Sequence, residues 1–128
     1  MSKNLGIFEK VDIRALWPHE AADFTPWLAK NENLRLLGDA IGIELKVKNT
    51  EVSVGPYSAD IVAEDVNCGD DVVIENQLGK TNHDHLGKLI TYAANLDAKT
   101  LVWIAPDFTD EHRRAVDWLN NSRTAAEI

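Results

Sequence analysis

Polar side chains interrupt a strongly apolar run near the middle of the chain. Val72-Val73-Ile74 is followed directly by Glu75, Asn76 and Gln77, whereas a strand buried on both faces usually reads as a continuous apolar run. In an extended chain Glu75 and Gln77 point to one face and Asn76 points to the other. The pattern therefore predicts one acid and one amide on a shared face at the end of a strand.

A second acid, Asp60, lies in the preceding extended segment and can reach Glu75 if the two segments form an antiparallel hairpin. A two-residue loop at Cys68-Gly69 puts Asp60 opposite Gln77 and diagonal to Glu75. A loop at Asn67-Cys68 instead puts Asp60 opposite Glu75. A three-residue loop would turn Asp60 to the other face, because side chains alternate along a strand.

Two converging carboxylates would repel each other, and a hard cation such as Mg²⁺ relieves that repulsion. Magnesium keeps several waters, takes one or two carboxylates and leaves positions for phosphate oxygens, which suits cleavage of a phosphodiester. The alternative is that Asp60 and Glu75 are ordinary strand-end acids in salt bridges. The spacing alone leaves both interpretations open.

The hydrophobic pattern around these residues predicts helices before and after the hairpin. Thr25-Pro26 resembles a helix start, Asn31-Glu32 offers a second one, and Gly42 is typical of a helix end, so we expect the first helix at about 25–41. Apolar residues at helical spacing predict a second helix from His83, and Thr109 caps a third.

Extended segments are predicted between these helices. Alternating or apolar residues indicate strands at 43–48, 57–66 and 71–78. Residues 100–105 are apolar on both faces, and we expect this strand to be central in the sheet. A short strand or arm at 5–17 is expected to be peripheral. The order predicts an α/β fold with a mixed central β-sheet flanked by helices.

Length and composition limit the class of protein. The 128 residues, of which 45% are hydrophobic, predict a single domain over 1–128 with its core at about 25–120. The net charge of −8 disfavours binding of a polyanion over the whole surface. A single cysteine, the absence of a signal-like start and the short apolar runs predict a cytoplasmic chain with no membrane role.

The order of elements and these residues together resemble the PD-(D/E)XK nuclease superfamily, which has a restriction-endonuclease-like fold. Ser58-Ala59-Asp60-Ile61-Val62 is similar to its strand-2 aspartate motif. Val73-Ile74-Glu75-Asn76-Gln77 is similar to its acid-x-lysine motif, with glutamine in the lysine position. Together with the segment His83 to Ala93, this E-x-Q variant resembles a group of uncharacterised bacterial nuclease-like proteins. The implied core is αβββαβ plus a C-terminal helix.

The resemblance implies Mg²⁺- or Mn²⁺-dependent phosphodiester hydrolysis of nucleic acid, with DNA favoured over RNA. Asp60 and Glu75 would bind the metal, and Glu32 on the first helix would assist them. Gln77 departs from the pattern, because a neutral amide can orient a water but cannot stabilise charge as lysine does. Lys88 could supply the missing cation.

Four further residues would contact nucleic acid under this interpretation. Lys88 and Tyr92 stand four apart on one helix face and resemble a Gln-x-x-x-Tyr motif of the superfamily, with one substitution. Lys80 could also approach the backbone of the polymer, and His85 could reach a phosphate or orient a water. For each of them, an ordinary solvated surface residue is the alternative.

Two other classes of function remain open. The first is a catalytically inactive nuclease-like module for binding or assembly, which Gln77 and the net negative charge favour. The second is an interaction domain in which Asp60 and Glu75 are only surface charges. Because the net charge weighs against tight binding of DNA by this chain alone, a homodimer or an additional domain is a predicted partner. The sequence after the last predicted helix also suggests a fragment of a longer protein.

Overall fold

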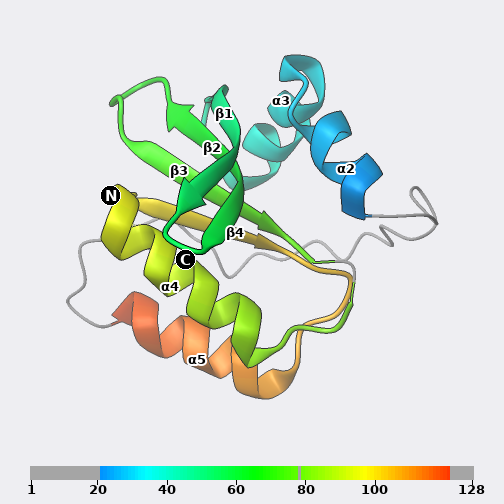
Figure 1. Ribbon diagram of the computed structural model, residues 1–128, viewed down its shortest axis with the longest axis vertical. Helices are drawn as coiled ribbons and strands as arrows, with labels where there is room; N and C mark the ends of the chain where they lie inside the picture. Colours follow the sequence, from blue (N-terminus) through cyan, green and yellow to red (C-terminus); the bar gives the residue numbers. More distant parts are fainter. Residues whose placement is uncertain (1–20, 78, 122–128) are drawn as a thin grey trace.

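The computed structural model describes residues 21–77 and 79–121, so the arm predicted at 5–17 lies outside the described residues. Two helices precede three strands, which are followed by a helix, a strand and a final helix (Figure 1). The elements are α2 (Ala21–Leu28), α3 (Asn31–Ile41), β1 (Leu45–Val54), β2 (Tyr57–Asp65), β3 (Asp71–Asn76), α4 (His83–Leu96), β4 (Thr100–Ile104) and α5 (Asp110–Asn121).

The described strands form one mixed sheet in the order β1-β2-β3-β4. β1 pairs with β2 and β2 with β3 in antiparallel fashion, while β3 and β4 are parallel. The connection from β3 to β4 runs through α4, as a parallel pair requires. The predicted class, an α/β fold with a mixed sheet flanked by helices, is confirmed.

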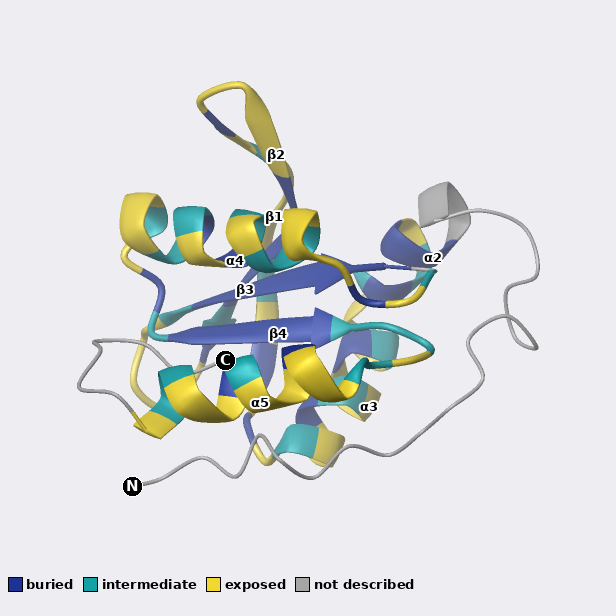
Figure 2. Ribbon diagram, turned by 90° about the horizontal axis from the view of Figure 1, so that it is seen from below, coloured by how far each residue is buried: buried dark blue, intermediate teal, exposed yellow. Residues whose placement is uncertain are grey.

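Apolar side chains cover both faces of the sheet, so the molecule has two cores. Helices α2 and α3 pack on one face through Phe24, Leu28 and Leu34. Helices α4 and α5 pack on the other face through Leu89, Tyr92 and Val116. Figure 2 shows β3 and β4 buried between the flanking helices.

The register of β2 against β3 is the one that brings the two predicted acids together. Ile61 pairs with Ile74 and Glu64 pairs with Asp71. The residue before Ile61, Asp60, therefore lies across from Glu75, the residue after Ile74. This agrees with the register predicted from a loop at Asn67-Cys68. The loop itself is longer, because the backbone bond from Asp65 N to Asp70 O closes it around residues 66–69.

The first predicted helix is instead two helices. α2 begins at Ala21, so Thr25-Pro26 lies inside it rather than at its start. Pro26 has no backbone N–H to donate to the preceding turn of α2. A new helix then starts at Asn31, as the second predicted start suggested, and ends at Gly42 in the left-handed conformation.

The expectation that the strand at 100–105 is central was wrong. β4 is at the edge of the described sheet, although Leu101, Val102 and Trp103 are buried. An edge strand covered by helices on both faces has the same apolar pattern as a central strand. Burial was predictable from the pattern, whereas position in the sheet was not.

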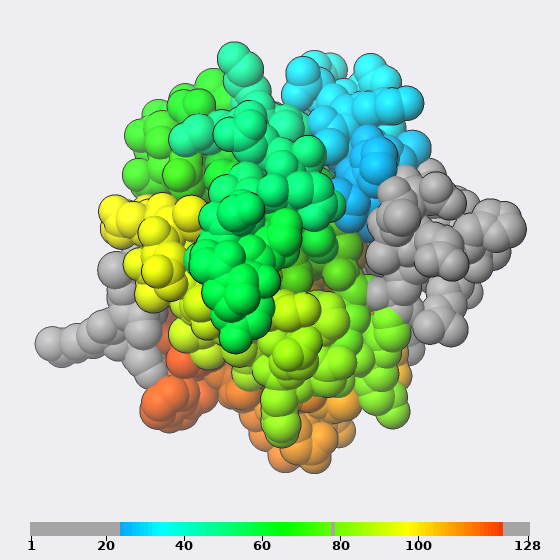
Figure 3. All heavy atoms as spheres, in the orientation of Figure 1, coloured from blue at the N-terminus to red at the C-terminus, as the bar shows by residue number. Residues whose placement is uncertain are grey.

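Two irregularities bend the β1–β2 hairpin. β1 has a bulge between Val47 and Asn49, and Glu51 has a φ of 51°. Beyond them Val54 and Ala59 pack with Tyr92 of α4. In Figure 3 the hairpin lies directly over α4. The bend therefore brings the start of β2, which carries Asp60, towards α4.

No helix in the ranges 21–77 and 79–121 is long and apolar enough to cross a membrane.

The contact between α3 and β1 allows a test of the packing. A Cβ added at Gly38 would collide with the backbone carbonyl oxygen of Ile43, whereas one added at Gly87 on α4 meets nothing within 4 Å. We expect Gly38→Ala to lower the free energy of unfolding by about 2 kcal/mol. Gly87→Ala should raise it by up to about 1 kcal/mol, because alanine favours helix.

Urea denaturation of the two variants measures the difference. Equal effects of the two substitutions would contradict the packing of α3 described above.

Candidate active site

Asp60 and Glu75 occupy the point where the backbone ladder between β2 and β3 ends. The last ladder pair is Ile61 with Ile74. Beyond it, side chains replace backbone bonds: the backbone N of Asn76 donates to Asp60 Oδ2 at 2.8 Å, and the backbone N of Asp60 donates to Glu75 Oε1 at 3.4 Å. This exchange fixes both carboxyl groups at the same place.

The two carboxyl groups are close enough to share a proton. Burial, and then the charge of Asp60, raise the pKa of Glu75 to about 8. Burial is also the main cause of a raised pKa at Asp60, which the bond from Asn76 opposes. A hydrogen bond between the side chains lowers the pKa of Asp60 and raises that of Glu75.

Helix α4 supplies the polar groups nearest to this pair. Its N-cap is Asn82, whose side chain accepts a hydrogen bond from the backbone N of His85. His85, Lys88 and Tyr92 recur at the spacing of one helix face. The charge of Lys88 lowers the pKa of Glu75, although burial dominates, and Lys88 Nζ also lies 3.2 Å from Asp84 Oδ2. Lys88 therefore acts on Glu75 electrostatically while it is paired with Asp84.

Tyr92 is fully buried, which does not suit the predicted contact with nucleic acid. Its hydroxyl donates to the carbonyl oxygen of Ser58 at 3.0 Å. Burial, followed by the charge of Glu75, raises its pKa to about 12. Tyr92 thus fastens α4 to the start of β2, two residues from Asp60.

Gln77 is not free to orient a water. Its Oε1 accepts from the indole N of Trp103 at 3.0 Å, and its Nε2 donates to the carbonyl oxygen of Lys80 at 2.6 Å. Its backbone N donates to Ile104 O at 2.8 Å. The residue at the lysine position of the motif therefore joins β3 to β4 and to the following loop.

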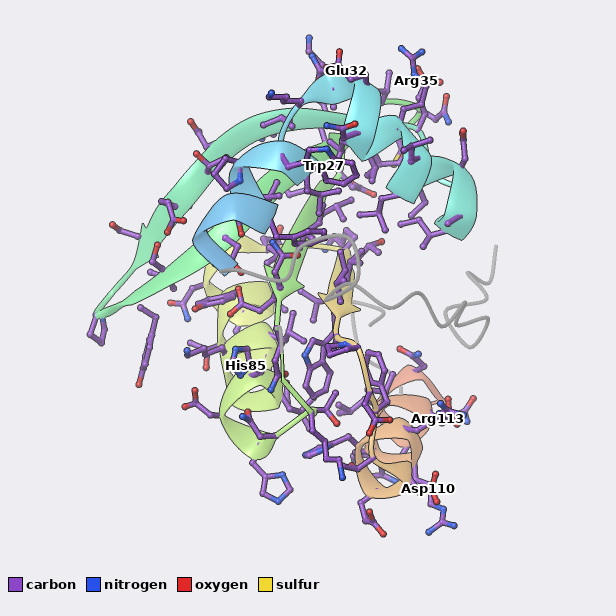
Figure 4. The ribbon with its side chains drawn as sticks, turned by 90° about the vertical axis from the view of Figure 1, so that its right-hand side faces the viewer. Trp27, Glu32, Arg35, His85, Asp110 and Arg113 are labelled. Carbon is purple, nitrogen blue, oxygen red and sulfur yellow. The ribbon has the colours of Figure 1, made fainter. Side chains whose placement is uncertain are left out.

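The structure does not bring the other two predicted residues to the pair. Glu32 is exposed in the first turn of α3, and Figure 4 shows it well away from His85 of α4. Its assistance to Asp60 and Glu75 stays a prediction. Lys80 is exposed on the loop after β3, and its backbone, rather than its ammonium group, is engaged with Gln77.

A third acid near the pair, Glu51, was missed in the sequence. Its neighbours Thr50 and Val52 pair with Ile61 and Ala59, so Glu51 lies across from Asp60. Its charge contributes to the raised pKa of Asp60, after burial. The sequence could have revealed this, because a two-residue turn at Gly55-Pro56 also puts Glu51 across from Asp60.

The carboxyl groups of Asp60 and Glu75 suit magnesium better than a metal ion that needs three or four protein ligands. Among the described residues no three His, Cys, Asp and Glu side chains are grouped to hold a metal. Asp60 and Glu75 offer two carboxyl groups in contact, and magnesium is commonly held by one or two carboxylates with water completing the shell. A divalent cation could replace the proton that the two groups share.

Two solved endonuclease structures share this fold. A repair endonuclease from Pyrococcus abyssi matches with a TM-score of 0.64 and 17% identity, over 78% of this chain and 43% of that chain. The EndoMS–dsDNA2 complex matches with a TM-score of 0.60 and 19% identity, over 76% and 40%. This chain thus spans less than half the length of either protein. No protein-family model and no curated protein matches it.

The structural role of Gln77 can be tested. Gln77→Ala leaves the indole N–H of Trp103 without its partner, and we expect the free energy of unfolding to fall by about 2 kcal/mol. Asn95→Ala is the matched control, because Asn95 is an exposed amide that donates only to Thr91 O. Urea denaturation measures both, and unchanged stability of Gln77→Ala would contradict the assigned role.

The raised pKa of Glu75 predicts an unusual pH dependence of stability. A carboxyl whose pKa is higher in the folded than in the unfolded state loses stability as pH rises from about 4.5 to about 8. When the pH is raised from 5 to 9, the free energy of unfolding of Glu75→Gln should therefore increase relative to that of the wild type by at least about 1 kcal/mol. This corresponds to roughly 3–6 °C in Tm.

Thermal unfolding at both pH values measures this gain. Glu111→Gln, at an exposed position in α5, controls for the loss of one negative charge. A difference in stability between Glu75→Gln and wild type that is independent of pH would contradict the raised pKa of Glu75.

Proposed function

We propose that this chain is the catalytic domain of a PD-(D/E)XK-type nuclease that hydrolyses phosphodiester bonds of DNA. The observation that carries the proposal is the contact between the carboxyl groups of Asp60 and Glu75 at the end of the β2–β3 ladder. A buried pair of like charges destabilises the fold unless a proton or a cation neutralises it. The likeness of the fold to two repair endonucleases supports the same conclusion.

In this proposal Asp60 and Glu75 hold Mg²⁺ or Mn²⁺. When bound, such an ion polarises the phosphoryl group and lowers the pKa of water. The chain itself contributes the orientation of the carboxylates, through the backbone N–H groups of Asn76 and Asp60. Lys88 supplies positive charge from α4 and takes the place of the lysine that Gln77 has replaced.

DNA is the proposed polymer because one of the two matching structures is a complex with double-stranded DNA. Three lysines of this chain are already paired with acids: Lys48 with Asp71, Lys88 with Asp84 and Lys99 with Asp97. Phosphates must therefore compete with these carboxylates. We infer that a second copy of the chain or a further domain contributes to DNA binding, in agreement with the net charge of −8.

One observation favours the runner-up, a catalytically inactive nuclease-like binding or assembly module. Both ends of the Gln77 amide are bonded within the protein, so the motif position that is normally a lysine serves the fold instead. Such a module would keep the fold and lack cleavage. Cleavage by the purified chain decides between the two.

The metal site and the reaction are tested together. Asp60→Asn and Glu75→Gln should each lower the rate of DNA cleavage at saturating Mn²⁺ at least about 100-fold, because each removes a charge that holds the ion. Calorimetric titration with Mn²⁺ alone should show weakened binding in both variants. Glu111→Gln is the control with the same loss of charge.

Metal binding without cleavage of any DNA substrate would support the inactive module. Neither binding nor cleavage in the wild type would contradict the metal site itself.

A further inference from the structure

The imidazole of His85 is held in one orientation by Asn82. Asn82 Oδ1 accepts from the backbone N of His85 at 2.9 Å and also lies 3.0 Å from His85 Nδ1. Because an amide oxygen can only accept, Nδ1 must carry the proton in this contact. In the neutral ring Nε2 is then unprotonated and presents a lone pair.

Charged groups from two elements act on this ring. Burial and the charge of Lys88 lower the pKa of His85, against the opposing effects of Asp84 on α4 and Asp60 on β2. The net shift is downward, so the neutral form is favoured at physiological pH. The half-buried ring thus combines a fixed tautomer with a basic nitrogen that is not protonated.

The ring stands on the face of α4 that carries Tyr92, whose hydroxyl donates to the carbonyl oxygen of Ser58, two residues from Asp60. Lys88, one turn further along, acts electrostatically on Glu75, and Asp60 acts on His85 itself. Figure 4 shows His85 on α4, well away from Arg113 of α5. No group of three His, Cys, Asp or Glu side chains among the described residues could hold a metal, so His85 is not part of one.

The geometry points to His85 Nε2 as the proton acceptor for the water that attacks the phosphodiester, a role that rests on the proposed function. As the water oxygen bonds to phosphorus, its proton passes to Nε2. The ester P–O bond on the opposite side breaks with its electron pair on the leaving oxygen, which takes a proton from solvent. His85 then releases its proton to solvent.

Asn82 is the positioning residue in this arrangement. Without its oxygen the imidazole can rotate and place the proton on either nitrogen, and the basic nitrogen is then not directed consistently. Gln77 cannot fill this role, because its amide has no basic nitrogen and is bonded on both sides. The base therefore comes from α4, outside the motif on β3.

The first test needs no activity and no metal. In ¹⁵N-labelled metal-free protein at pH 7.5, the imidazole nitrogen shifts should show Nδ1 protonated and Nε2 unprotonated at His85. Asn82→Ala should show a mixture of tautomers. Protonation of Nε2 in the wild type would overturn the proposal whatever the activity.

The second test is kinetic. His85→Gln should lower kcat about 100-fold, the usual size of a general-base contribution, with little change in KM and in calorimetric affinity for Mn²⁺. Asn82→Asp keeps a helix cap and places a carboxylate on Nδ1, so the acidic limb of the rate profile should move up by about one pH unit. His83→Gln, on the same helical turn, is the matched control.

The outcomes separate the two proposals. If the wild type cleaves DNA and His85→Gln retains its rate and pH profile, His85 is not the base and the nuclease proposal stands. Parallel loss of Mn²⁺ affinity and rate in His85→Gln would make His85 a metal ligand and likewise overturn the proposal. A wild type that cleaves no substrate overturns both proposals.

Discussion

The carboxyl groups of Asp60 and Glu75 lie together where β2 and β3 stop pairing, and the surrounding hydrogen bonds hold them in this position. Each group accepts a backbone N–H that the ladder no longer uses, so the acids complete the hydrogen bonding of the strands as they leave the ladder. Their mutual repulsion, in a place shielded from water, is what raises the pKa of Glu75 beyond the effect of burial. Stability and the proposed ion binding therefore depend on the same pair.

The elements around the pair are joined by buried polar contacts in addition to apolar packing. Gln77 links β3 to Trp103 of β4, Asn76 donates to Thr25 of α2, and Tyr92 links α4 to the start of β2. Each contact satisfies a polar group that would be costly to bury alone. Together they hold the ends of three strands and two helices around the carboxyl groups.

In the proposed nuclease, helix α4 provides the positive charge and the basic nitrogen that the end of β3 lacks. Gln77 has become part of the framework, and positive charge and a basic nitrogen are instead carried by Lys88 and His85 on one helix face. The N-cap contact between Asn82 and the imidazole serves both the helix end and the ring.

The sequence by itself determined the α/β class, the approximate positions of β2 and β3 and the start of α4, because periodicity and turn residues are local signals. It left three registers open for Asp60, and the structure selected the one that puts Asp60 across from Glu75. Only the tertiary structure decided that β4 lies at the edge of the described sheet, that Glu32 is exposed in the first turn of α3 and that Gln77 and Tyr92 are bound within the fold. Those facts depend on contacts between residues that are far apart in the sequence. The local pattern of polar and apolar residues does not distinguish a free side chain from one that is hydrogen-bonded within the fold.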